Sequence, residues 1–286
     1  MQIKNAIVTG ATSAIGIALI NELLDSGANV TAIHRKGSAR KKNIPAHERV
    51  RVIEADLHNL ESDIEASNPC DIFFHLAWEG IRDDFADQYK NIKMTLDCLK
   101  LAEKLGCKRF ICTGTQAEYG ETTELITEKT PLKPTNAYGA CKVAAYYLTV
   151  DLARKMNIEH TWARVFSVYG PNDNSHTLFS SLICDLNCKG KSQLKTNGEH
   201  IWNYLHENDA AKALMLLGVC ESTNTAFNVA SKVNKPLKDY FEGFPVDVGK
   251  EISAVNLNVN VDKLISAIGE YERHDFKNVI STLLAT

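Results

Sequence analysis

The sequence has no long apolar run and little excess of either charge, and these absences exclude several classes of protein. No stretch approaches the ~20 apolar residues that a membrane-spanning helix needs, and the first residues lack the pattern of a cleavable signal peptide. The formal net charge is only -3, and the basic runs are too short to follow a nucleic-acid backbone. We therefore expect a cytoplasmic protein without a membrane or nucleic-acid partner.

The cysteine pattern argues against a structural zinc site. None of the eight cysteines stands in a Cys-x-x-Cys pair, and Cys184 and Cys188 have no histidine or cysteine partner at zinc-like spacing. We expect reduced thiols and no bound metal. The remaining composition, with 44% hydrophobic and 23% charged residues over 286 positions, is that of an ordinary globular protein with one large core or two smaller lobes.

Short apolar runs rich in β-forming residues alternate along the chain with longer segments of helical period. This alternation is typical of βαβ units, whose strands form a parallel sheet. We predict a Rossmann-type, doubly wound α/β fold with a ligand site beyond the carboxyl ends of the strands. The predicted strands cover residues 3–8, 30–33, 50–53, 72–76, 110–112 and 161–166.

The alternation weakens after Gly170, where connections rich in Asn, Ser and Gly predominate. Such connections predict a smaller, discontinuous lobe in the C-terminal part of the chain, formed by long insertions after the later strands. We expect this lobe to bind the substrate. The Rossmann-type domain is predicted at residues 1–171 and 200–230, and the smaller lobe at residues 172–199 and 231–286.

Two long segments have the period of amphipathic helices. They cover residues 84–105 and 136–156, and we expect them to lie side by side on one face of the sheet. The apolar stripe of the first helix is predicted to hold Phe85, Tyr89, Ile92, Leu96 and Leu99.

A glycine-containing turn follows the first predicted strand and leads into an apolar helix. Gly10 permits the tight turn, Gly16 permits close packing of the helix on the strand, and the free amides of the helix N-terminus attract phosphates. Ser13 replaces the usual middle glycine, and its small side chain still leaves the backbone accessible. A tight turn without a ligand is the alternative. The predicted dinucleotide contacts in this turn are Gly10, Thr12, Ser13, Ala14, Ile15 and Gly16.

The residues at the end of the second predicted strand indicate whether the dinucleotide is NAD or NADP. An acid there accepts hydrogen bonds from the adenosine ribose, whereas the 2′-phosphate of NADP needs cations. The sequence has His34, Arg35 and Lys36 and no acid, so we predict NADP(H) as the cofactor, with NAD(H) as the alternative. Arg35 with Lys36 or Arg40 would hold the phosphate; a solvated basic loop is the other interpretation. After the third strand, the expected adenine contacts are Asp56 and Leu57.

Tyr138 and Lys142 stand four residues apart and therefore share one face of the second long helix. A phenol with a pKa of about 10 is a poor acid–base group at neutral pH, but a neighbouring cation favours the phenolate and lowers the pKa. This spacing is therefore suited to proton transfer. For the spacing alone, an amphipathic surface helix is the alternative.

Several segments follow one another in an order that is specific to one family. His75-Leu76-Ala77 ends the fourth strand, the fifth strand lies in residues 109–120, and residues 164–171 and 203–209 come after the helix with Tyr138. Together with the glycine turn, this set resembles the extended short-chain dehydrogenases of the NAD-dependent epimerase/dehydratase family, which act on sugar nucleotides. The resemblance covers about residues 3–230. It implies that Leu76 and Ala77 contact the cofactor.

The resemblance also implies roles for other residues. Tyr138 would donate or accept the proton, Lys142 would hold the nicotinamide ribose and lower the tyrosine pKa, and Thr115 would hydrogen-bond the reacting sugar oxygen. Relatives pair the two long helices with those of a twofold mate, which implies a homodimer. The implied substrate contacts are Trp78, Asn91, Thr115, Gln116, Ser167 and Trp202. Core packing is the alternative interpretation for the two tryptophans, and a surface position is the alternative for Asn91.

Departures from the family pattern exclude some of the reactions that members of the family catalyse. Members that remove water carry an Asp-Glu pair directly after the hydroxyl residue, and one branch that epimerises beside a ketone carries a cysteine at the second position. This chain has Gln116 and Ala117 there, and an amide and a methyl group cannot move those protons. Ser167 also replaces the usual asparagine, which puts the contact with the substrate diphosphate in doubt.

Carbonyl reduction and C4 epimerisation remain, because both need only a hydride and the three residues Thr115, Tyr138 and Lys142. The segments 75–82 and 202–205 are also similar to those of short NDP-4-keto-deoxysugar reductases. We predict NADPH-dependent reduction of the C4 ketone of a nucleotide-activated 6-deoxysugar. An NAD-dependent nucleotide-sugar C4 epimerase and a non-catalytic dinucleotide-binding protein are the alternatives.

Overall fold

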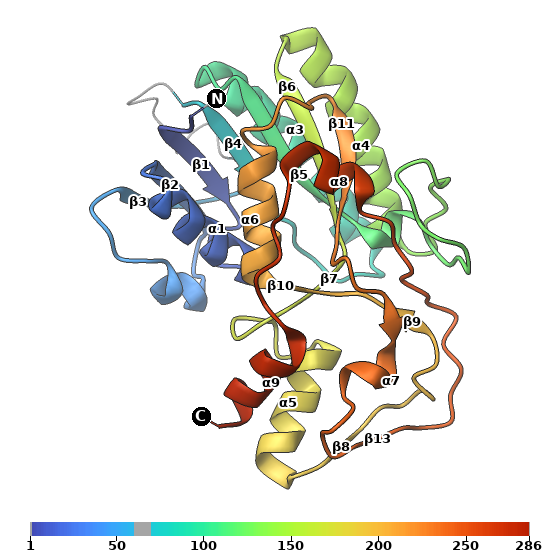
Figure 1. The fold of residues 1–286 in the computed structure, drawn as a ribbon. Coiled ribbons are helices and arrows are strands. Elements are labelled where there is room, and N and C mark those ends of the chain that lie inside the picture. The colour runs from blue at the N-terminus through green and yellow to red at the C-terminus, as the bar shows by residue number, and fades with distance from the viewer. Residues whose placement is uncertain (1, 60–69, 286) are drawn as a thin grey trace.

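A seven-stranded parallel sheet forms the centre of the larger domain (Figure 1). The computed structural model describes residues 2–59 and 70–285. The chain enters the sheet at a central strand and extends it in both directions, so the predicted doubly wound α/β fold is confirmed. In spatial order the strands are β11 (Thr225–Val229), β6 (Glu159–Val165), β5 (Arg109–Thr115), β4 (Ile72–His75), β1 (Asn5–Thr9), β2 (Asn29–Arg35) and β3 (Val50–Ala55).

Helices cover both faces of this sheet (Figure 1). On one face α1 (Ala14–Asp25) packs against α6 (Glu207–Leu217), and on the other α3 (Phe85–Lys104) packs against α4 (Ala137–Met156). Successive strand residues point to opposite faces, so Phe73 and Phe74 enter different cores although both are fully buried. The continuous apolar runs therefore reflect strands that are covered on both sides.

The two long helices occur where the sequence predicts them, and they lie side by side. Asp84 and Asn136 begin them, because their side chains accept hydrogen bonds from the free amides of the first turn. The predicted apolar stripe of α3 is wrong in its first turns, since Phe85 and Tyr89 are 65% and 61% exposed. The inner face of α3 is instead formed by Gln88, Asn91, Met94, Thr95, Cys98, Leu99, Leu101 and Ala102.

The smaller lobe has an aromatic core of its own, with Tyr169, Phe179, Tyr204 and Phe276 at its centre. The strand pair β7 (Ser167–Tyr169) and β10 (Tyr204–His206) connects this core to the sheet. The other elements of the lobe are α5 (Leu178–Lys189), α7 (Leu237–Tyr240), α9 (Phe276–Leu284), β8 (Ser192–Gln193) with β13 (Val246–Asp247), and β9 (Ile201–Trp202) with β12 (Lys235–Pro236).

One segment that we assigned to the smaller lobe packs with the larger domain. The helix α8 (Asp262–Ile268) contacts α6 and β11, and Val259, Leu264 and Tyr271 belong to the core between α1, α6 and the sheet. The predicted division at 231–286 is therefore interrupted, because the chain returns to the Rossmann-type domain before it ends in α9 (Figure 1). The remaining domain bounds stay predictions; residues 1, 60–69 and 286 lie outside the described part of the chain.

Within the described residues, no helix is long and apolar enough to cross a membrane. In the same ranges, no group of three or more His, Cys, Asp and Glu side chains is arranged to hold a metal ion. The eight cysteines are free thiols.

Candidate active site

A cavity of about 480 Å³ lies at the carboxyl edge of the sheet, with one wall from the smaller lobe. The turn after β1, the loop after β4, the end of β5, the first turns of α4 and the segment after β6 form the opposite walls. Parallel strands bring these distant segments together because their carboxyl ends share one edge. The predicted site residues that line the cavity are Ser13, Ala14, Ile15, Leu76, Trp78, Thr115, Gln116, Tyr138, Lys142, Ser167 and Trp202.

The glycine turn has the geometry of a phosphate cradle. Gly10 has a φ of 68°, and a Cβ atom added there would lie 2.9 Å from the backbone nitrogen of Ala77. A Cβ added at Gly16 would lie 2.3 Å from the Gly10 carbonyl oxygen. The Ser13 hydroxyl accepts from the Gly16 amide at 3.0 Å and donates to the Gly10 oxygen at 2.8 Å. Ser13 therefore caps the N-terminus of α1. These residues fit a dinucleotide diphosphate at the helix N-terminus.

The basic residues after β2 separate into two groups. Arg35 and Lys36 are exposed and lie outside the cavity lining, and His34 is buried with its Nδ1 2.9 Å from the Arg35 oxygen. Arg40 instead lines the cavity, where its guanidinium donates to the backbone oxygen of Asn172 in the smaller lobe at 2.5 Å. Arg35 therefore stands exposed at the end of β2, and Arg40 links the two lobes.

The adenosine end is completed by the segments after β1 and β3. Asp56 is exposed, and its Oδ1 accepts from the His58 amide at 3.0 Å, while Leu57 is buried beneath it. Ser38 donates to the Thr12 hydroxyl at 3.4 Å, so the loop after β2 contacts the glycine turn. The predicted adenosine contacts are thus held at neighbouring strand ends.

Lys142 is a buried residue of the cavity wall. Its Nζ donates to the Thr113 oxygen at 2.6 Å and lies 3.8 Å from the centroid of the Trp78 ring. Burial lowers the pKa of Lys142 to about 8, because the charged ammonium is removed from water. The carbonyl and the ring together fix the direction of this side chain.

Tyr138 begins the same helix, and its phenol faces Thr115. Burial raises the pKa of Tyr138, while a hydrogen bond with Thr115 and the charge of Arg82 act in the opposite direction. The Arg82 guanidinium lies 4.7 Å from the phenol ring, and its backbone oxygen accepts from the Tyr138 amide at 3.1 Å. In this structure the charge of Arg82 therefore acts to lower the tyrosine pKa.

Thr115 ends β5 and is held by a fully buried carboxylate. Glu118 accepts from the Thr115 amide at 2.8 Å, from the Trp162 indole at 2.9 Å and from Nε of Arg164 at 2.6 Å. The Thr115 hydroxyl donates to the Gln116 side-chain oxygen at 2.8 Å. The backbone of the hydroxyl residue is thus anchored by the ion pair between Glu118 and Arg164, which our sequence analysis did not single out.

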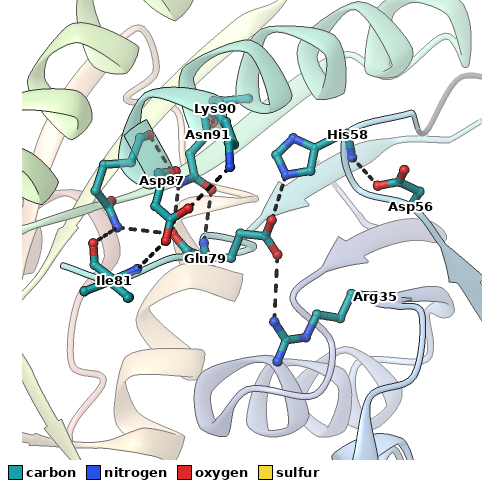
Figure 2. A network of polar contacts seen from close by, with 10 residues as sticks. Arg35, Asp56, His58, Glu79, Ile81, Asp87, Lys90 and Asn91 are labelled. Carbon is teal, nitrogen blue, oxygen red and sulfur yellow. Dashed lines mark hydrogen bonds and ion pairs between the residues drawn. The ribbon is translucent and has the colours of Figure 1, made fainter. Parts of the chain in front are cut away.

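Asn91, which we predicted as a substrate contact, is fully buried and does not line the cavity. Its side-chain oxygen accepts from the Glu79 amide at 3.0 Å, and its nitrogen donates to the Glu79 oxygen at 2.9 Å (Figure 2). Gln88 supports the same loop, since its side-chain oxygen accepts from the Trp78 indole at 2.6 Å. Asn91 therefore positions the loop after β4, from which Trp78 reaches the cavity and packs edge-on against Tyr138.

The wall from the smaller lobe carries Trp202 and Tyr204. Among the described residues, the Trp202 indole nitrogen and the Tyr204 hydroxyl are buried without a hydrogen-bond partner. Ser167 opens β7 and lies half-buried on the neighbouring wall. Buried donors without a partner are costly, so this wall favours a polar ligand.

Sequence reasoning missed two charged residues of the cavity, which are Arg82 and Asp173. Arg82 stands in the loop after β4, and only the fold shows that it contacts Tyr138. Burial raises the pKa of Asp173, whose carboxylate accepts from the Thr177 hydroxyl at 2.6 Å. No spacing in the sequence relates these residues to the Tyr138 helix.

The glycine turn, the strand that ends at Thr115 and the helix with Tyr138 and Lys142 meet at one cavity of a doubly wound sheet. This arrangement defines a dinucleotide-dependent enzyme of the extended short-chain dehydrogenase type. The model of the NAD dependent epimerase/dehydratase family matches residues 6–230, and the chain belongs to this family. The expected class of NAD(P)-dependent oxidoreductase is thereby confirmed at the level of the family.

Similar curated proteins act on sugar nucleotides according to their names. The chain is 27% identical over 174 residues to a UDP-glucose 4-epimerase of Corynebacterium glutamicum, which covers 59% of this chain and 52% of that protein. It is 24% identical over 251 residues to dTDP-6-deoxy-L-talose 4-dehydrogenase (NAD(+)) of Aggregatibacter actinomycetemcomitans, covering 84% and 89%. The chain thus spans about half the length of the first relative and most of the second.

Solved structures share the fold over nearly the whole chain. MoeE5 in complex with UDP-glucuronic acid and NAD superposes with a TM-score of 0.82 at 23% identity, covering 98% of both chains. UDP-glucose 4-epimerase of Thermotoga maritima has the same TM-score at 20% identity, covering 98% of this chain and 97% of that chain. At these identities the comparison shows the fold alone.

Proposed function

We propose that the protein reduces the C4 ketone of a nucleotide-activated 6-deoxysugar with NADPH. The observation that supports this most is the cavity wall, where Thr115, Tyr138 and Lys142 gather beside the glycine turn while Gln116 occupies the position of a dehydratase acid. A relative that covers 84% of this chain is named for oxidation of a 6-deoxysugar nucleotide at C4, the reverse of the proposed reaction.

The chain's own residues can bind and protonate the ketone. The Thr115 hydroxyl would turn from Gln116 to donate to the carbonyl oxygen, and the Tyr138 phenol would transfer its proton to the alkoxide that forms. Bound NADPH would supply the hydride. Lys142 would hold the nicotinamide ribose and favour the phenolate after proton transfer, and solvent would then restore the phenol proton.

The reaction is tested by supplying the purified protein with NDP-4-keto-6-deoxysugars and following NADPH absorbance together with product formation. We expect one NADPH consumed for each sugar alcohol formed. The alternative epimerase, favoured by the similarity to UDP-glucose 4-epimerases, would interconvert two NDP-hexoses with no net consumption of NADPH and would retain tightly bound NAD. That pair of results would overturn the proposal.

Arg35→Ala is expected to weaken NADPH binding by about 10- to 100-fold and NADH binding far less. A charge-assisted hydrogen bond to the 2′-phosphate contributes about 1.5–3 kcal/mol, and NADH has no phosphate at this position. Dissociation constants from quenching of protein fluorescence would measure both cofactors. Lys42→Ala is the control, since Lys42 is also an exposed cation of the same segment but is not among the predicted cofactor contacts. Equal losses for NADPH and NADH would argue against a 2′-phosphate contact.

The homodimer and the cytoplasmic location stay predictions. The exposed apolar side chains of α3 and α4 are compatible with a twofold mate packed on these helices, because exposed aromatic and aliphatic groups favour burial. They include Phe85, Tyr89, Tyr147, Leu148 and Val150.

A further inference from the structure

Glu79 lies at the rim of the adenosine end and contacts a positively charged or protonatable group on each side. Its Oε2 is 3.8 Å from Nη1 of Arg35, and its Oε1 is 2.7 Å from Nε2 of His58 (Figure 2). Arg35 ends β2, and His58 follows β3. One carboxylate from the loop after β4 therefore reaches across to two neighbouring strand ends.

The backbone that carries the Glu79 carboxylate is anchored, and the Glu79 side chain is less exposed than that of Arg35. Asn91 binds both the amide and the carbonyl oxygen of Glu79, and Gln88 donates to the same oxygen at 3.2 Å. Both supporting side chains are buried in α3, whereas the Arg35 side chain is 67% exposed and that of Glu79 is 33% exposed. When a ligand competes for this ion pair, Arg35 is thus the partner that moves.

We propose that Glu79 is a specificity-determining residue that lowers the preference for NADPH over NADH by competing with the 2′-phosphate for Arg35. The inference rests on the dinucleotide site of the proposed function. A phosphate monoester carries a charge of about −1.5 to −2 at pH 7, so it would have to draw Arg35 away from Glu79 and then lie near the same carboxylate. NADH has no such phosphate and disturbs neither contact. A prediction based on Arg35 without Glu79 therefore overestimates the preference for NADPH over NADH.

Glu79→Gln separates the charge from the shape of the side chain. The amide oxygen can still accept from His58, and the backbone contacts with Asn91 do not involve the changed atoms. We expect the dissociation constant for NADPH to fall by about 3- to 5-fold, the upper end of the scale for an exposed ion pair, and that for NADH to change by less than about 2-fold. Glu79→Ala is a second variant with the same expected direction.

Asp83→Asn is the matched control. Asp83 is an exposed acid in the same loop, so its change removes an equal charge without removing the contact with Arg35. The double variant Arg35→Ala, Glu79→Gln tests the route of the effect: if Glu79 acts through Arg35, the gain in NADPH affinity disappears in the Arg35→Ala background. Binding of NADH to each variant shows that the fold is retained.

An unchanged ratio of NADPH to NADH affinity in both Glu79 variants would overturn the inference, and so would an equal gain in Asp83→Asn or in the Arg35→Ala background. If the wild-type chain binds NADPH and reduces keto-sugar nucleotides under these results, the proposed function stands and only the role of Glu79 fails. Binding of neither dinucleotide by the wild-type chain would overturn both.

Discussion

Tyr138→Phe is expected to lower ketone reduction by at least ~10²-fold while leaving NADPH affinity nearly unchanged, because a positioned acid contributes on this scale and the change removes only the phenol oxygen. Burial raises the pKa of Tyr138, so in the cofactor-free protein the phenol carries its proton at neutral pH. That state suits a group that must donate to an alkoxide. Single-turnover measurements with saturating NADPH would report the step directly.

Tyr89→Phe is the matched control for this change. Tyr89 is an exposed tyrosine on α3, so the loss of its hydroxyl should leave turnover unaltered. The phenylalanine at position 138 keeps the ring that packs against Trp78 and Arg82, and the fold should persist. Turnover close to that of the wild-type protein would remove Tyr138 from the mechanism. In contrast, Lys142→Ala should impair both cofactor binding and turnover, since Lys142 would hold the nicotinamide ribose.

Glu118→Ala is expected to lower the free energy of unfolding by about 3–5 kcal/mol, because it leaves the buried charge of Arg164 without its partner. Both side chains of this ion pair are almost completely buried. The change also removes the acceptor of the Trp162 indole and of the Thr115 amide, so these buried donors lose their hydrogen bonds. Urea denaturation followed by circular dichroism would measure the difference.

Two further variants serve as controls for this measurement of stability. Asp151→Ala breaks an exposed ion pair on α4, with Arg154 and Lys155 as its partners, and should change stability very little because solvent screens such pairs. Glu118→Ala combined with Arg164→Leu removes both buried charges and should recover part of the loss. Equal stability of Glu118→Ala and the wild-type protein would show that the buried pair does not anchor the end of β5.

The fold could be predicted because it depends on patterns that are local in the sequence. Strands covered on both sides need continuous apolar runs, as β4 shows, and helices on the sheet need the longer period seen between them. The helices α3 and α4 begin after Asp84 and Asn136, whose side chains cap the first turn. The departure at Phe85 and Tyr89 arose because periodicity shows which residues share a face, whereas the burial of each turn depends on what packs over that turn.

The candidate site could be predicted where a motif carries its own geometry. The glycine turn, the four-residue spacing of Tyr138 and Lys142, and the strand that ends at Thr115 each specify a local shape, and parallel strands with a common carboxyl edge bring such shapes together. Asn91 was assigned to the substrate, but its bonds to the Glu79 backbone exist only once α3 has docked against the loop after β4.

The amino-acid sequence alone predicts the class of fold, the dinucleotide turn and the helix that carries Tyr138, since each depends on residues a few positions apart. The surroundings that set the chemistry of these residues depend on packing. Arg82 beside the phenol, Glu118 beneath Thr115, and Glu79 between Arg35 and His58 join segments that no spacing relates. Desolvation and charge act through space, so the pKa values of Tyr138 and Lys142 are set by the neighbours that the folded chain brings to them.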